Sequence, residues 1–198
     1  MNTPTNDPGT GTGSDHASLT WRLVLRDGRV VAVRPITPQD LPALRDAIEH
    51  TDAETLRLRF LGGRPPRDEA SLHHLVEVDY STRLALVAID ESCNGAGIAR
   101  YEGSPGSDIA EVAVTVAPGW RRVGLGTGLL VLLSQAAIQH GIRQFTATYL
   151  AENQEVARLI ARSGLPHTST VSAGVVEVEI DLSETALTPH SLPGCISD

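Results

Sequence analysis

Apolar and polar residues alternate along residues 109–116, near the middle of the chain. Valines recur at every second position of its second half, and Glu111, Ala113 and Thr115 occupy the positions between them. A period of two in a run of β-branched residues predicts a strand with one buried face. The Ala-Pro-Gly sequence directly after it ends the strand, because proline removes a backbone donor and glycine favours a turn.

Similar patterns predict the other elements of the chain. Alternation and β-branched residues predict strands over residues 21–25, 29–34, 84–90, 97–102, 144–150, 168–171 and 175–182. Apolar residues at helical spacing predict helices over residues 51–61, 67–78, 129–140 and 153–163, after a first helix that begins near Thr37. This order predicts one mixed sheet with flanking helices, in the α/β or α+β class.

The first helix has a defined start and a defined face. Thr37 and Pro38 suit the N-cap and the first helical position. Leu41, Leu44 and Ile48 follow at helical spacing, so we expect them to form its buried stripe.

The two ends of the chain differ in composition from the part between them. Residues 1–18 hold almost no large apolar side chains, and residues 185–198 are similarly poor in them and contain two prolines. Both ends are therefore expected to be disordered. The 198-residue chain is expected to form one domain over residues 19–184.

A glycine-rich stretch, residues 120–128, leads from the 109–116 strand to the predicted 129–140 helix. Three of its residues are glycine, and Arg121 and Arg122 lie at its start. Backbone N–H groups at a helix start bind anions, and the helix dipole and the two arginines add to the attraction. This stretch predicts a pyrophosphate site, although a plain loop with two solvated arginines is the alternative.

Two common phosphate-binding loops do not fit this stretch. A Walker loop needs a lysine, and all 16 basic residues of this chain are arginine. A dinucleotide fingerprint needs glycine or alanine where this chain has Leu129. What remains is an Arg-x-x-Gly-x-Gly motif at Arg121, Gly124 and Gly126.

This motif resembles the acetyl-CoA-binding loop of the GNAT superfamily of N-acetyltransferases, and two further features occur in the same order in that fold. They are an Arg-Pro-Ile-Thr-Pro segment from Arg34 and a helix that opens at Asn153 and ends at Gly164. The resemblance implies a mostly antiparallel sheet with a parallel strand–helix–strand core. It also implies acetyl-CoA as co-substrate and no metal. The implied cofactor-binding residues are Val114, Thr115, Val116, Arg121, Arg122, Val123, Gly124, Leu125, Gly126, Thr127 and Asn153.

These residues are expected to act in different ways. The resemblance implies that successive backbone amides of the loop hold the pyrophosphate. Backbone groups of Val114 and Val116 are expected to pair with the pantetheine arm as a neighbouring strand would. Asn153 either only caps its helix or, as the resemblance implies, also contacts that arm.

Shorter segments, such as Leu-Arg-Phe at residues 58–60 and Ala-Glu-Val-Ala-Val at residues 110–114, resemble the bacterial protein lysine acetyltransferases that modify acyl-CoA synthetases. This resemblance implies direct transfer of an acetyl group to an exposed lysine of a protein partner. Two alternatives stay open: acetylation of a small amine, and a non-catalytic domain that senses acyl-CoA.

Glu111 is the candidate general base. The resemblance implies this role for the glutamate of the Ala-Glu-Val-Ala-Val segment, whereas a solvated strand glutamate is the alternative. Many relatives place a tyrosine where this chain has Ile160, so a general acid is not evident. The thiolate has a pKa of about 8.5 and can leave without one. Tyr149 is the other candidate acid, but its hydroxyl is expected at the surface.

Composition narrows the possible partners and compartments. The net charge of −8 argues against nucleic-acid binding. The longest apolar run is too short to cross a membrane, and no signal peptide is evident, so a cytoplasmic location is expected. Cys93 and Cys195 match no disulfide framework or zinc site.

Overall fold

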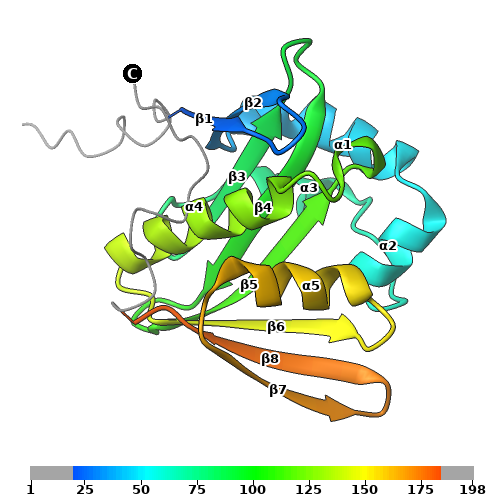
Figure 1. The fold of residues 1–198 in the computed structure, drawn as a ribbon. Helices are drawn as coiled ribbons and strands as arrows, with labels where there is room; N and C mark the ends of the chain where they lie inside the picture. Colours follow the sequence, from blue (N-terminus) through cyan, green and yellow to red (C-terminus); the bar gives the residue numbers. More distant parts are fainter. Residues whose placement is uncertain (1–19, 184–198) are drawn as a thin grey trace, which may run out of the picture.

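The computed structural model describes residues 20–183, which form one eight-stranded sheet in the order β1-β2-β3-β4-β5-β6-β8-β7 (Figure 1). The strands are β1 (Trp21–Val24), β2 (Val30–Pro35), β3 (Arg83–Ile89), β4 (Gly95–Gly103), β5 (Ile109–Val116), β6 (Gln144–Leu150), β7 (His167–Ser172) and β8 (Val175–Asp181). The helices are α1 (Leu41–His50), α2 (Ala53–Arg59), α3 (Glu69–Val76), α4 (Leu125–Gln139) and α5 (Gln154–Ser163). The predicted terminal tails lie outside the described residues.

The sheet is antiparallel at every pair of neighbouring strands except β5 and β6. These two run parallel and are connected through α4, as a parallel pair requires a crossover between its strands. The expected mixed sheet with a parallel strand–helix–strand core is therefore confirmed.

The main core lies between the sheet and α4. Leu86, Tyr101 and Phe145 point to this face, where they are fully buried beside Leu129 and Leu133 of α4. In Figure 1, α4 and α5 lie in front of the sheet, and α1 and α3 lie behind it. A smaller cluster fills the rear face, formed by Ile36, Val76 and Ala85.

The buried stripe expected along α1 is weaker than its spacing suggests. Leu41, Leu44 and Ile48 are only half buried, and α1 has no fully buried residue. The small cluster behind the sheet leaves one side of α1 in solvent. A short 3₁₀ turn, Pro38–Asp40, precedes α1, so the helix starts three residues later than the Thr-Pro signal predicts.

The long helix α4 starts at Leu125, four residues earlier than expected, so two of the loop glycines lie in its first turn. A Cβ atom at Gly126 would lie 2.7 Å from Leu159 Cδ1 of α5, and one at Gly128 would lie 2.9 Å from Leu23 Cδ1 of β1. These glycines let two neighbouring elements approach α4 closely. The expected start at residue 129 was wrong because glycine is a poor helix former and packing overrides that preference here.

Candidate active site

The sheet splits between β5 and β6. The two strands pair only where residues 109–111 meet residues 144–146, and the last pair joins Glu111 to Thr146. Beyond this point the strands diverge, as Figure 1 shows. The split opens a cleft of about 690 Å³, a volume typical of ligand sites.

One wall of the cleft is the second half of β5. Val112, Val114, Thr115 and Val116 all line it. Because β6 has turned away, this edge of β5 has backbone groups free of β6 along most of the cleft. An extended ligand can pair with such an edge as an added strand would.

The start of α4 forms one end of the cleft, which we call the loop end. Gly124 caps the helix with φ +98°, a conformation that favours glycine. Gly124, Gly126 and Thr127 line the cleft there. The first N–H groups of a helix have no partner within it, so they and the helix dipole favour an anion at this place.

Arg121 and Arg122 lie at the loop end and bond to different neighbours. Arg121 donates from Nε to the carbonyl of Val116 at 3.2 Å and from Nη2 to Oγ1 of Thr55 at 2.7 Å. Arg122 pairs with Glu155 of α5, with 3.0 Å between Nη2 and Oε1. Both side chains line the cleft and bring positive charge to the start of α4.

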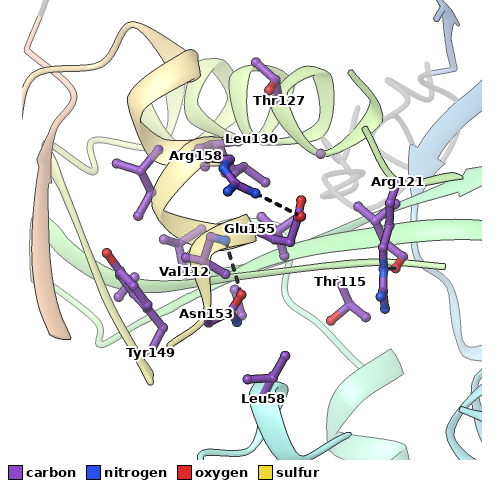
Figure 2. Close-up of a pocket in the computed structure, with 18 of the residues that line it drawn as sticks. Leu58, Val112, Thr115, Arg121, Thr127, Leu130, Tyr149, Asn153, Glu155 and Arg158 are labelled. Carbon is purple, nitrogen blue, oxygen red and sulfur yellow. Dashed lines mark hydrogen bonds and ion pairs between the residues drawn. The ribbon is translucent and has the colours of Figure 1, made fainter. Parts of the chain in front are cut away.

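Asn153 lies where α5 meets the cleft. Its side-chain oxygen accepts a hydrogen bond from the N–H of Val156 at 3.3 Å, which caps α5 as its sequence position predicts. Figure 2 shows this bond and, beside it, the ion pair between Glu155 and Arg158. Asn153 also lines the cleft, so its amide group is close to any ligand that lies along β5.

Glu111 lies at the opposite end, which we call the acyl end, where β5 and β6 are still paired. Its side chain is exposed, and the sheet register places Glu102 of β4 and Thr146 of β6 on either side of it. The expected base is therefore in the cleft and open to solvent, about five residues along the strand from the arginine-rich loop.

The structure adds Arg59, the middle residue of the Leu-Arg-Phe segment at residues 58–60, to the cleft. It comes from the last turn of α2 and lines the cleft together with Glu111. Burial lowers the pKa of its guanidinium, and the carboxylate of Glu111 partly opposes this shift. No signal in the sequence connects residues 59 and 111, because only the packing of α2 on the sheet brings them together.

Tyr149 and Ile160 complete the apolar part of the cleft. Tyr149 is 9% exposed, so most of its side chain is buried. It sits at the end of β6 beneath α5 and lines the cleft, as Figure 2 shows. Ile160 of α5 is 3% exposed and also borders the cleft, where it offers no proton donor.

Most of the predicted site residues therefore meet in this one cleft. Those that line it are Glu111, Val114, Thr115, Val116, Arg121, Arg122, Gly124, Gly126, Thr127 and Asn153. Val123 does not line it, and the side chain of Leu125 is fully buried in the core. These two residues have only backbone groups to offer at the loop.

Residues 20–183 also bear on metal binding and membrane insertion. No group of three or more histidine, cysteine or acidic residues there is placed to hold a metal ion. No helix in this part of the chain is long and apolar enough to cross a membrane. Cys93 is exposed, and Cys195 lies outside the described residues.

Known proteins resemble the chain in sequence. A family model described as an acetyltransferase (GNAT) domain matches residues 31–166. An acetyltransferase of Pseudomonas aeruginosa is 31% identical over 147 residues, which are 73% of this chain and 79% of that protein. Acetyltransferase Pat of Mycolicibacterium smegmatis is 31% identical over 169 residues, which are 83% of this chain and 50% of Pat. The chain thus spans about half the length of Pat.

Solved structures resemble it in fold. The GNAT domain of S. lividans PAT superposes with a TM-score of 0.74 at 29% identity, over 82% of this chain and 96% of that domain. A cAMP-binding acyltransferase from Mycobacterium smegmatis superposes with a TM-score of 0.62 at 25% identity, over 87% of this chain and 51% of that protein. The split sheet, the glycine-rich start of α4 and these matches agree, and the chain belongs to the GNAT family of acetyltransferases.

Proposed function

We propose that this acetyltransferase moves the acetyl group of acetyl-CoA to the side-chain amine of a lysine in a partner protein, with Glu111 as general base. Acyl-CoA synthetases are the proposed partners. The observation that carries the proposal is the position of Glu111, which lies in the same cleft as the anion-binding start of α4 and at its opposite end.

The residues of the cleft fit acetyl-CoA along its length. The start of α4, with Arg121 and Arg122, suits the pyrophosphate. The free edge of β5 at Val114 and Val116 suits the amides of the pantetheine arm. Gly126 and Leu159 are in contact distance of each other, so the wall of the cleft is close-packed at this point.

The proposed reaction forms an amide bond and breaks the carbon–sulfur bond of the thioester. Acetyl-CoA supplies an activated acyl group when it is bound. The lysine must lose a proton to attack, and its ammonium has a pKa of about 10.4. Glu111 is in place to accept this proton, directly or through a water molecule.

The leaving thiolate needs no general acid in this proposal. A free thiol has a pKa of about 8.5, so the thiolate is a good leaving group near neutral pH. Ile160 occupies the position where many relatives have a tyrosine, and its apolar side chain instead helps to exclude water from the cleft. Tyr149 is close enough to the cleft to hydrogen-bond there through its hydroxyl.

The acceptor is assigned from the resemblance to protein lysine acetyltransferases and from charge. The chain carries no lysine, so it presents no lysine side chain to its own thioester, and its net charge of −8 favours a basic partner segment. A polyamine would be attracted in the same way, which keeps a small amine as the second candidate.

The test is to incubate the protein with acetyl-CoA and purified acyl-CoA synthetases, and beside them a panel of small amines. Mass spectrometry locates any acetylated lysine, and release of free thiol gives the rate. We expect acetylation of a synthetase that Glu111→Gln abolishes. Turnover confined to small amines would contradict the protein acceptor, and binding of acetyl-CoA without any turnover would favour a sensor.

A further inference from the structure

Arg59 differs from the arginines at the loop end of the cleft. Arg121, Arg122 and Arg158 each bond to a neighbouring side chain or carbonyl. Arg26 and Arg162, which also line the cleft, are exposed to solvent. Arg59 is half buried, lines the cleft and has no hydrogen bond or ion pair to any residue between 20 and 183. Its guanidinium lies over the ring of Phe60, with Cζ 5.1 Å from the ring centroid.

Two more arginines and two glutamates surround this position. The sheet register aligns Arg83 of β3, Glu102 of β4 and Glu111 of β5 in one row across the sheet. Arg100 lies two residues before Glu102 on the same face and is 8% exposed. The cluster therefore holds three arginines against two carboxylates.

The excess positive charge is poorly bonded. Arg83 Nε and Arg100 Nη2 are buried atoms that form no hydrogen bond within the described part of the chain, although they lie 3.5 and 3.7 Å from the carboxylate of Glu102, and Arg83 donates through Nη2 to the carbonyl of His74. That carboxylate also accepts a hydrogen bond from His74 Nε2 at 2.8 Å. Burial, with Arg59 and Arg83 nearby, lowers the pKa of Arg100 to about 10, although Glu102 opposes the shift.

Glu102 is shared between Arg83 and Arg100, and the half-buried Arg59 has no hydrogen bond or ion pair to another described residue, so an anion that reached Arg59 would be stabilised. Of the three arginines, only Arg59 lines the cleft. Arg83 and Arg100 do not line it, but their positive charges add to the attraction that an anion at Arg59 would experience. A guanidinium offers two parallel N–H groups that match a carboxylate.

The anion that fits here is not the pyrophosphate, because that group belongs at the start of α4. We propose that Arg59 binds a carboxylate carried by one of the two reactants, next to Glu111. The carboxylate is either on the acyl group of the thioester or on the acceptor, beside its amine. This inference rests on the proposed function and extends it to the choice of reactants.

The chemistry of transfer is unchanged by this contact. Glu111 accepts the proton that the ammonium loses, the neutral amine nitrogen bonds to the acyl carbon, and the carbon–sulfur bond breaks so that coenzyme A leaves as the thiolate. The second proton of the nitrogen is released to solvent as the amide forms. The carboxylate takes part only through its hydrogen bonds to Arg59, so it places one reactant relative to the other.

The experiment compares matched pairs of reactants that differ by one charge. One arm uses succinyl-CoA and butyryl-CoA as donors, which share a four-carbon acyl chain. The other arm uses acetyl-CoA with two lysine peptides that differ only by Glu or Gln beside the lysine. The variants are Arg59→Gln and Arg59→Lys, and the control is Arg64→Gln, an exposed arginine in the loop after α2.

In one of the two arms we expect the wild-type protein to prefer the anionic reactant in kcat/KM by about 10-fold or more, the range for a charge-assisted bidentate contact. Arg59→Gln should remove this preference and leave the neutral reactant nearly unaffected. Arg59→Lys should keep part of it, and Arg64→Gln all of it. Circular dichroism establishes that each variant is folded.

Two results would overturn the inference. One is a wild-type protein without preference for the anionic member of either pair. The other is an Arg59→Gln variant that loses activity equally with both members of each pair. Calorimetric binding of the same donors and peptides repeats the comparison without turnover. If no acceptor is acetylated with acetyl-CoA, the proposed function is contradicted. The binding preferences measured by calorimetry still decide whether Arg59 selects an anionic reactant.

Discussion

At the loop end of the cleft, Arg121 and Arg122 are exposed and bonded to their neighbours, whereas at the acyl end Arg59 is half buried and bonded to none. The two ends also differ in how they are built. The glycines and the two arginines of the loop end come from one continuous segment, residues 121–126, to which Thr55 of α2 and Glu155 of α5 add side-chain bonds. The acyl end combines Arg59 of α2 with Glu111 of β5, which are far apart in the chain.

This difference predicts that the loop end mainly binds the cofactor and that the acyl end mainly selects the reactants and transfers the proton. Surface arginines around a helix start suit a ligand that is itself strongly charged and binds mainly by electrostatics. A half-buried cation beside an exposed carboxylate suits selection among reactants and proton transfer. Substitutions at the loop end should therefore change affinity for acetyl-CoA, and substitutions at the acyl end should change the rate of transfer.

The largest effect is expected at the acyl end. Glu111→Gln keeps the size of the side chain and removes the carboxylate proposed as the base, so kcat should fall by about 10²–10⁴-fold. Affinity for acetyl-CoA, measured by calorimetry, should stay the same. Glu179→Gln on β8 is the control, because Glu179 is exposed and stands in the same row of the sheet. A Glu111→Gln protein as active as the wild type would contradict the assignment of proton transfer to the acyl end.

A large effect on affinity is expected from Gly126→Val at the loop end. The new Cβ would overlap Leu159 Cδ1, at 2.7 Å, and press on Val116 Cγ2, at 3.4 Å. Overpacking of this kind costs about 1–3 kcal/mol, and a loss of about 1.4 kcal/mol in binding lowers affinity for acetyl-CoA about 10-fold.

The double variant Gly126→Val/Leu159→Ala separates two causes of this loss. Removing the leucine side chain relieves the overlap and should restore the melting temperature. If affinity stays low, the Cβ itself blocks the cofactor, and if affinity returns, the displaced leucine was the cause. Unchanged affinity in a folded Gly126→Val protein would contradict the assignment of the loop.

Substitutions of Asn153 should have smaller effects on stability and affinity, and they distinguish a residue that only caps α5 from one that also contacts the cofactor. Asn153→Ala removes the cap of α5 and should lower stability by about 1 kcal/mol. Asn153→Asp keeps an acceptor for the N–H of Val156, so stability should be nearly unchanged. Thermal unfolding measures both. Lower affinity for acetyl-CoA in Asn153→Asp would add a cofactor contact to the cap, and unchanged affinity would limit Asn153 to capping.

The smallest effect is expected from Arg122→Gln. Its ion pair with Glu155 is exposed, so the free energy of unfolding should change by less than about 0.5 kcal/mol. Affinity for acetyl-CoA should fall modestly, and by less at high salt, because exposed charges are screened. A salt-independent loss would contradict a purely electrostatic role at the loop end.

Much of the fold could be predicted because its signals are local. The alternation over residues 109–116 marks a strand that the structure contains, with β5 at the predicted bounds. Bounds were less predictable where packing competes with local preference. The start of α4 at Leu125 depends on Leu159 and Leu23, which press against its glycines from α5 and β1.

The sequence by itself determined the parts of the site that are contiguous: the strand that carries Glu111, the arginines and glycines of the loop, and the cap at Asn153. These parts show as residue types at short spacing, and the roles expected of Glu111 and Asn153 come from the resemblance to the acetyltransferases. Only the tertiary structure decided that β5 and β6 separate after Glu111, and that α2 brings Arg59 to the same cleft. Contacts of this kind depend on side-chain packing between distant segments, and no local pattern encodes which of them will meet.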